Sequence, residues 1–177
     1  MIRIFFYISV LLLISASCQN PVQKDLSDIT LQKKKESEAL INMNNYVARR
    51  NRDLIERFVN RTGFNMQETG SGLWIEIYSR GSGKRVEIDN WVEISFTLQS
   101  LDGTVLDSSY NRKTANFRVG KAAVVSGLAE GILLLHEGDS ARFIIPPHLA
   151  YGNFGDQQNI APGTFLFYDI FLREVKP

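Results

Sequence analysis

The residues of this chain that could do chemistry are few, and they favour binding over covalent catalysis. Tyr151 stands among glycines in the segment from Ala150 to Gly155, which follows an apolar run closed by two prolines. An aromatic side chain in such a loop gains little from packing and suggests a contact surface. Asp107 is the second candidate, because it follows an Asp-Gly turn and a short apolar pair. Its carboxylate could lie at the rim of a binding site or could cap a turn.

Hydrolysis, metal chemistry and nucleic-acid binding are disfavoured by the composition. No serine lies in a nucleophile-elbow pattern, and the two histidines, His136 and His148, have no partner at a triad or metal-ligand spacing. The single cysteine, Cys18, excludes an internal disulfide and a cysteine-based metal cluster. A formal net charge of +1 over 177 residues gives no support for a nucleic-acid partner. We therefore expect no metal, no cofactor and no nucleic acid.

Residues 1–17 are expected to form an export signal. The nearly unbroken apolar run from Ile4 to Ile14 is short of the roughly 20 residues that span a bilayer, and small residues precede Cys18. This arrangement resembles a bacterial lipobox, with Ser15 where leucine is usual. Cys18 would then be acylated and would anchor the mature chain to a bacterial membrane, facing the periplasm. A plain secretory signal followed by an incidental cysteine is the alternative.

Residues 18–69 are expected to contain a linker and an amphipathic helix. The polar composition from Gln19 to about Thr30 predicts the linker, and the residues from about Leu31 to Arg61 favour a helix that stops at Thr62-Gly63. One face of this helix carries a stripe of apolar side chains. The stripe would pack against the following domain, or else it would form a homodimer or dock another partner. The apolar residues that recur at helical spacing are Met43, Tyr46, Val47, Leu54, Ile55, Phe58 and Val59.

The pattern of residues 70–177 is typical of short strands and turns. It predicts an α+β domain with one short helix against an antiparallel sheet. Alternating apolar residues predict strands at 73–78 and 91–98, and Asp102-Gly103 predicts a tight turn into the next strand. The short helix is expected from about Ser126 to Leu134. The remaining strands are expected near 117–119, 141–145 and 165–175.

The spaced motifs of this region resemble the FK506-binding-protein (FKBP) type of peptidyl-prolyl cis-trans isomerase. The motifs lie at residues 101–109, 144–155 and 160–163, and the similarity spans about Gly70 to Lys176. The resemblance implies an FKBP-like sheet wrapped on its short helix, with a substrate cleft between the two. Besides Asp107 and Tyr151 as catalytic residues, the substrate-binding positions that it implies are Phe96, Leu106, Val124, Val125, Leu128, Ile160 and Tyr168.

Three polar groups are expected to act on the substrate. We expect the Tyr151 hydroxyl to hold one substrate carbonyl, and the resemblance implies that the Ile160 backbone N–H holds another. Asp107 would favour the partial positive charge that develops on the twisted nitrogen, or would pair with Arg112.

The chain departs from the family pattern at four positions of the cleft. Two aromatic surfaces for a proline ring are lost, which predicts weaker macrolide binding and lower turnover. The departures are Leu128 where tryptophan is usual, Leu106 and Tyr168 where phenylalanine is usual, and Phe96 where tyrosine is usual.

The sequence thus predicts a lipid-anchored isomerase that assists the folding or assembly of proline-containing envelope proteins. Proline isomerisation is slow enough to limit folding, so such a catalyst has a use outside the cytoplasm. The N-terminal segment is similar to gliding-motility-associated lipoproteins of the same family, which would imply a motility or secretion apparatus as the client. The alternative, favoured by Leu106 and Leu128, is a chaperone or partner-binding module that uses the same cleft without useful catalysis.

Overall fold

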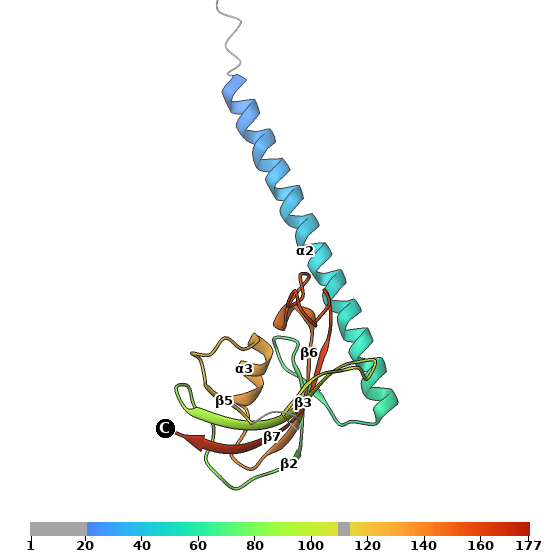
Figure 1. The fold of residues 1–177 in the computed structure, drawn as a ribbon. Helices are drawn as coiled ribbons and strands as arrows, with labels where there is room; N and C mark the ends of the chain where they lie inside the picture. The colour runs from blue at the N-terminus through green and yellow to red at the C-terminus, as the bar shows by residue number, and fades with distance from the viewer. Residues whose placement is uncertain (1–20, 110–113) are drawn as a thin grey trace, which may run out of the picture. The chain divides into compact units, whose positions relative to one another are not determined.

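The computed structural model describes residues 21–109 and 114–177, which divide between Arg49 and Arg50 into two compact units. Helix α2 (Pro21–Thr62) begins in the first unit and ends in the second (Figure 1). The predicted linker is therefore wrong for residues 21–30. Proline is well suited to the first helical position, where its missing N–H costs nothing, and this start signal outweighs the polar composition. Cys18 and the predicted export signal lie outside the described residues.

Helix α2 ends where the sequence predicts. Gly63 adopts a left-handed conformation with φ of 72°, and its N–H donates to the Val59 carbonyl at 2.9 Å. Glycine takes this conformation without the steric cost that a Cβ brings, so Thr62-Gly63 is a true stop. Within the first unit the apolar side chains of the helix are solvent-exposed, with exposed fractions of 65% for Leu40, 61% for Met43 and 46% for Val47. No helix described over residues 21–109 and 114–177 is long and apolar enough to cross a membrane.

The second unit is built on an antiparallel sheet of seven strands among its described residues, which confirms the α+β prediction. The strand order is β1-β2-β6-β7-β3-β4, and β5 pairs with β3 (Figure 1). The strands are β1 (Gln67–Glu68), β2 (Trp74–Ser79), β3 (Trp91–Ser100), β4 (Val105–Ser108), β5 (Ala115–Arg118), β6 (Ser140–Ile145) and β7 (Leu166–Lys176). Two further elements are helix α3 (Ser126–Ile132) and the short 3-10 helix η2 (Pro147–Leu149).

Alternation along the strands separates two apolar clusters, one on each face of the sheet. On β6, Phe143 and Ile145 belong to the larger cluster, which also contains Leu128 and Ile132 of α3. Ile144 lies between them in sequence and belongs to a smaller cluster with Ile55 from the last turns of α2. The sheet therefore carries α3 on one face and the end of α2 on the other.

Two glycines allow α3 to lie close against β6. A Cβ placed on Gly131 would be 2.6 Å from Cε2 of Phe143, and one on Gly127 would overlap the Ile145 side chain. Since these glycines are four residues apart, they lie on the same face of the helix. Their close approach fixes the position of α3, and hence of the residues directly before it.

Candidate functional site

The nine predicted site residues come from five parts of the second unit, and seven of them join one apolar cluster. Leu128, Ile160 and Tyr168 are buried in the larger cluster, and Phe96, Leu106, Val124 and Val125 pack against it partly exposed. Asp107 on β4 is exposed, and Tyr151 in the loop after η2 is 39% exposed. The structure thus gathers an apolar group of side chains with two polar ones at the solvent boundary.

One row of residues across the sheet places an acid and a phenol on the cluster's face. Leu98 of β3 is in register with Asp107 of β4 on one side and with Tyr168 of β7 on the other. Residues directly opposite one another in a ladder project to the same face of a sheet. Phe96 lies two residues before Leu98 on β3. The centroid of its ring is 5.7 Å from the centroid of the Tyr168 ring, at an interplanar angle of 50°.

The end of β4 is tied to β3 by a serine hydroxyl. Ser109 Oγ accepts the Phe96 N–H at 2.9 Å and donates to the Phe96 carbonyl at 3.2 Å. Asp107 Oδ1 accepts the N–H of Ser108 at 2.8 Å, so the carboxylate does have the local capping contact that its sequence context allows. The other predicted partner of Asp107, Arg112, lies outside the described residues.

The Tyr151 hydroxyl is available to a ligand. It makes no hydrogen bond to any residue in the described ranges, and the side chain is only partly buried. Partial burial raises the pKa of Tyr151 above its usual value of 10.0, and the negative charges of Asp156 and Asp107 raise it further. The phenol therefore stays protonated at neutral pH and can donate a hydrogen bond to a carbonyl oxygen.

The role predicted for the Ile160 N–H does not fit the structure. Asp156 Oδ1 accepts this N–H at 2.7 Å, together with those of Gln158 and Asn159 at 2.9 Å. The Ile160 carbonyl in turn accepts the N–H of Asp156 at 3.1 Å. Because the Ile160 N–H is already engaged, this residue can contribute its buried side chain to the site but not a free donor.

A different backbone donor lies beside the site, at Val125. This residue immediately precedes α3 in an extended conformation, and its N–H has no acceptor among the described residues. Ser126 Oγ donates to the Leu149 carbonyl at 3.1 Å, which ties this end of α3 to the segment that leads into Tyr151. The sequence predicted Val125 as an apolar contact. A free N–H depends on backbone geometry, which the type of a valine does not reveal.

A second cluster of polar residues resembles a hydrolase site in type but not in geometry. Ser71 Oγ donates to Glu130 Oε1 at 2.8 Å, whereas His148 Nε2 lies 3.0 Å from the backbone carbonyl oxygen of Ser71. A triad needs the imidazole against the serine hydroxyl. His148 is exposed beside the two prolines, and it joins two turns rather than activating a nucleophile.

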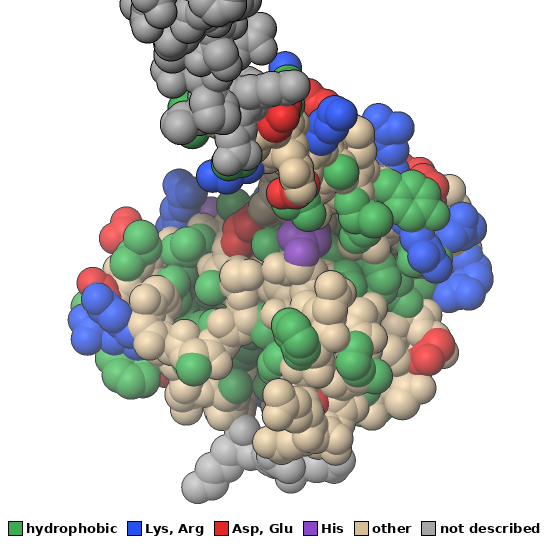
Figure 2. Space-filling view, turned by 90° about the horizontal axis from the view of Figure 1, so that it is seen from above, with side chains coloured by type: hydrophobic (Ala, Val, Ile, Leu, Met, Phe, Trp, Pro, Cys, Tyr) green, Lys and Arg blue, Asp and Glu red, His purple; other side chains and the backbone are tan. Residues whose placement is uncertain are grey.

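Figure 2 shows one face of the molecule. In the view of Figure 2, uncharged side chains predominate over the middle of the face, and Lys, Arg, Asp and Glu lie mostly toward its edge.

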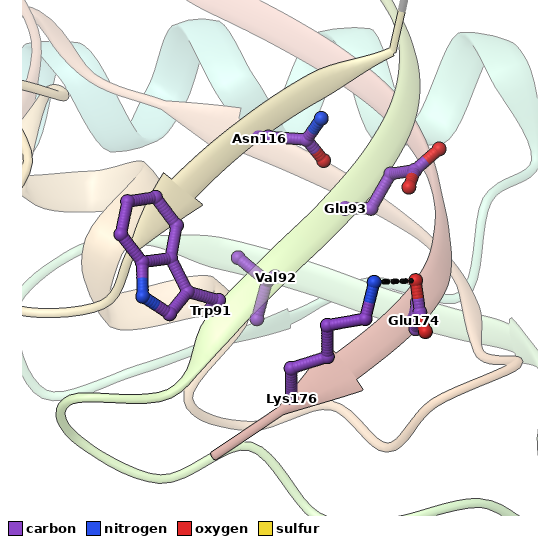
Figure 3. Close-up of a pocket in the computed structure, with 6 residues that line it drawn as sticks. All are labelled: Trp91, Val92, Glu93, Asn116, Glu174 and Lys176. Carbon is purple, nitrogen blue, oxygen red and sulfur yellow. Dashed lines mark ion pairs between the residues drawn. The ribbon is translucent and has the colours of Figure 1, made fainter.

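A separate hollow is lined by Trp91, Asn116 and a Lys176–Glu174 ion pair of 2.7 Å (Figure 3). It contains none of the nine predicted residues, and the described residues hold no cluster of potential metal ligands.

Comparisons with known proteins agree on one family. The model of the family "FKBP-type peptidyl-prolyl cis-trans isomerase" matches residues 83–173. The chain is 38% identical over 136 residues to the macrophage infectivity potentiator of Trypanosoma cruzi, covering 76% of this chain and 67% of that protein. It is 34% identical over 131 residues to the probable FKBP-type peptidyl-prolyl cis-trans isomerase FkpA of Neisseria meningitidis serogroup B, covering 72% of this chain and 47% of that protein.

Solved structures show the same likeness. The crystal structure of FkpA from Escherichia coli superposes with a TM-score of 0.65 at 25% identity, covering 92% of this chain and 75% of that one. The crystal structure of AtFKBP13 superposes with a TM-score of 0.61 at 30% identity, covering 64% of this chain and 99% of that one. The chain spans about half the length of its curated relatives from Neisseria meningitidis and Haemophilus influenzae, at 47% of each.

Proposed function

We propose, because this chain belongs to the family of FKBP-type peptidyl-prolyl cis-trans isomerases, that it catalyses rotation about X–Pro bonds at the nine-residue site described above. The family membership confirms the enzyme class predicted from the sequence. The observation that carries the proposed activity is the free Tyr151 hydroxyl beside an apolar cluster that contains Leu128, Ile160 and Tyr168.

Rotation about an X–Pro bond needs an apolar environment around the amide rather than a nucleophile. An X–Pro bond rotates over a barrier of about 18–20 kcal/mol because resonance gives the C–N bond partial double-bond character. The charge-separated resonance form is stabilised by water, so an apolar site weakens it and favours the twisted state. A thousandfold acceleration requires about 4 kcal/mol, which desolvation and one or two hydrogen bonds can supply.

We assign the polar roles from the contacts. The Tyr151 hydroxyl would hold one substrate carbonyl, and the free N–H of Val125 would hold a second, in place of the engaged N–H of Ile160. Asp107 would lie at the rim, where its charge favours a partial positive charge on the twisted nitrogen. Leu106, Val124 and Phe96 would contact the proline ring and its neighbours.

The test is the isomerisation rate of a proline-containing peptide with the purified chain. Wild type should accelerate the reaction, and Tyr151→Phe should lower kcat/KM by about 2- to 10-fold, as expected for one neutral hydrogen bond. Tyr46→Phe removes an exposed hydroxyl of α2 and should leave the rate unchanged. A wild-type protein that leaves the peptide's rate at the uncatalysed value would refute the activity.

A second candidate function uses the same site without catalysis. Leu106 and Leu128 provide apolar surface but no aromatic platform, which suits the holding of unfolded chains. Suppressed aggregation of a refolding client together with an unchanged proline-limited rate would favour this chaperone function over the isomerase.

The setting of the activity is also a proposal. We propose that Cys18 is acylated and anchors the chain in a bacterial envelope, where it would act on proline-containing envelope proteins. Cys18→Ser should then abolish fatty-acid labelling and move the protein to the soluble fraction, and unchanged fractionation would contradict the anchor. The proposed role in gliding motility rests on the resemblance of the N-terminal segment. Normal gliding after deletion of the gene would contradict that role.

We further propose a homodimer through the first unit. Its support is the row of exposed apolar side chains on α2, which includes Leu40, Met43 and Val47.

A further inference from the structure

The hydroxyl group of Tyr168 has no hydrogen-bond partner among the described residues. The side chain is 7% exposed, yet its oxygen makes no hydrogen bond to any residue within 21–109 or 114–177. The other residues that β7 contributes to the cluster are aliphatic: Leu166, Ile170, Leu172 and Val175. Phenylalanine would fill the same apolar space, and the hydroxyl adds nothing to the contacts of the ring with the cluster. Packing alone therefore does not account for a tyrosine at this position.

The position of Tyr168 places this hydroxyl among the polar groups of the site. Tyr168 lies in the cross-strand row with Leu98 and Asp107, and the centroid of its ring is 5.7 Å from that of the Phe96 ring. Burial raises the pKa of Tyr168 well above its usual value, and electrostatic interactions with Tyr151 and Asp107 raise it further. Tyr151 and Asp107 are the most exposed residues of the site, so the hydroxyl end of Tyr168 lies near the solvent boundary of the cluster.

We propose that the Tyr168 hydroxyl donates a hydrogen bond to a carbonyl oxygen of the bound peptide, an inference that rests on the isomerase function proposed above. It is a binding donor in addition to Tyr151 and Val125. The phenol remains protonated over the whole neutral range and so can donate, whereas Asp107 as a carboxylate can only accept. The ligand class is a polypeptide with a free backbone carbonyl next to its proline, and a purely apolar guest gains nothing from this group.

The test is Tyr168→Phe in the full chain, with a tetrapeptide that carries leucine before proline. We expect kcat/KM to fall about three- to tenfold and the peptide's Kd to rise by a similar factor. The melting temperature should stay the same, because the substitution removes no hydrogen bond within the described residues and keeps the packed ring.

Tyr78→Phe is the matched control. The Tyr78 hydroxyl donates to Asp169 Oδ1 at 2.7 Å, and Asp169 is on the opposite face of β7 from Tyr168. Its loss should lower the melting temperature and leave the peptide's Kd unchanged.

The outcomes separate the two proposals. An active wild type with unchanged kcat/KM and Kd in Tyr168→Phe would overturn the role of the hydroxyl and leave the isomerase intact. Weaker binding accompanied by a lower melting temperature would also overturn it, because the hydroxyl would then be structural. A wild type that isomerises no peptide would remove both proposals.

Discussion

Asp156 determines the shape of the loop that carries Tyr151 and Ile160. One of its carboxylate oxygens accepts three consecutive N–H groups, and these hydrogen bonds lower the pKa of Asp156 below its usual value. The folded pKa lies below the unfolded one. The ionised group therefore stabilises the loop above the unfolded pKa, and this contribution is lost as pH falls through the folded pKa.

We predict that Asp156→Ala loosens this loop. The N–H groups of Gln158, Asn159 and Ile160 lose their shared acceptor, so their amide hydrogen exchange should accelerate on the order of tenfold. Asp102→Ala is the control, since Asp102 accepts the Thr104 N–H at 2.9 Å in the separate turn between β3 and β4. If exchange at residues 158–160 is as slow in Asp156→Ala as in wild type, the carboxylate is not the restraint.

The same carboxylate shows what sequence reasoning missed at the site. Residue types and the family resemblance predicted which side chains gather, and the structure brings seven of the nine into one apolar cluster. They did not predict which backbone donors remain free. An Asp followed by polar residues is a turn signal in which the side chain accepts N–H groups just after it, and this signal was available at Asp156. The free N–H of Val125 had no such signal.

Elements were predicted well where periodicity is long. Alternating apolar residues predicted strands β2 and β3, and the turn signal at Asp102-Gly103 predicted β4. The glycine after Thr62 predicted where α2 ends. Strand β1 has two residues and η2 has three, too short for any period to show. The start of α2 was not predicted, because the polar composition of residues 21–30 is typical of a linker and Pro21 is a single, weak start signal.

The contact between α3 and β6 leads to a prediction about stability. Gly131→Ala gains about 1 kcal/mol of helix propensity, but its Cβ would meet the buried Phe143 ring at 2.6 Å. Overpacking of this kind costs about 1–3 kcal/mol, so we expect a net loss of up to about 2 kcal/mol in urea unfolding. Gly70→Ala is the control, because nothing lies within 4 Å of its added Cβ. Equal stability of the two variants would show that the ring moves freely.

At the scale of the whole molecule, the two units differ in how they use apolar side chains. The second unit buries them on both faces of its sheet, whereas α2 in the first unit exposes Leu40, Met43 and Val47. Spacings of three and four residues place these three on one stripe of the helix. A second copy would present the same stripe, and a two-fold axis would bring both together in a self-complementary contact.

We therefore predict that Val47→Glu converts a dimer into a monomer. Two copies of the variant would place like charges at the proposed interface, which would otherwise bury valine, and burial of one such side chain contributes about 1.5 kcal/mol or more per copy. The measurement is sedimentation velocity over a range of micromolar concentrations. The control is Val105→Glu, at a residue of β4 that is 58% exposed, which should leave the dimer intact.

The wild-type result decides this proposal before any variant does. A wild-type chain that sediments as a monomer at the highest concentration would leave the stripe without a second copy. If wild type dimerises and Val47→Glu does so equally, the interface lies elsewhere. Loss of the dimer with unchanged peptide isomerisation would instead show that the first unit sets assembly while the second carries the activity, as expected if the catalytic residues all belong to residues 50–177.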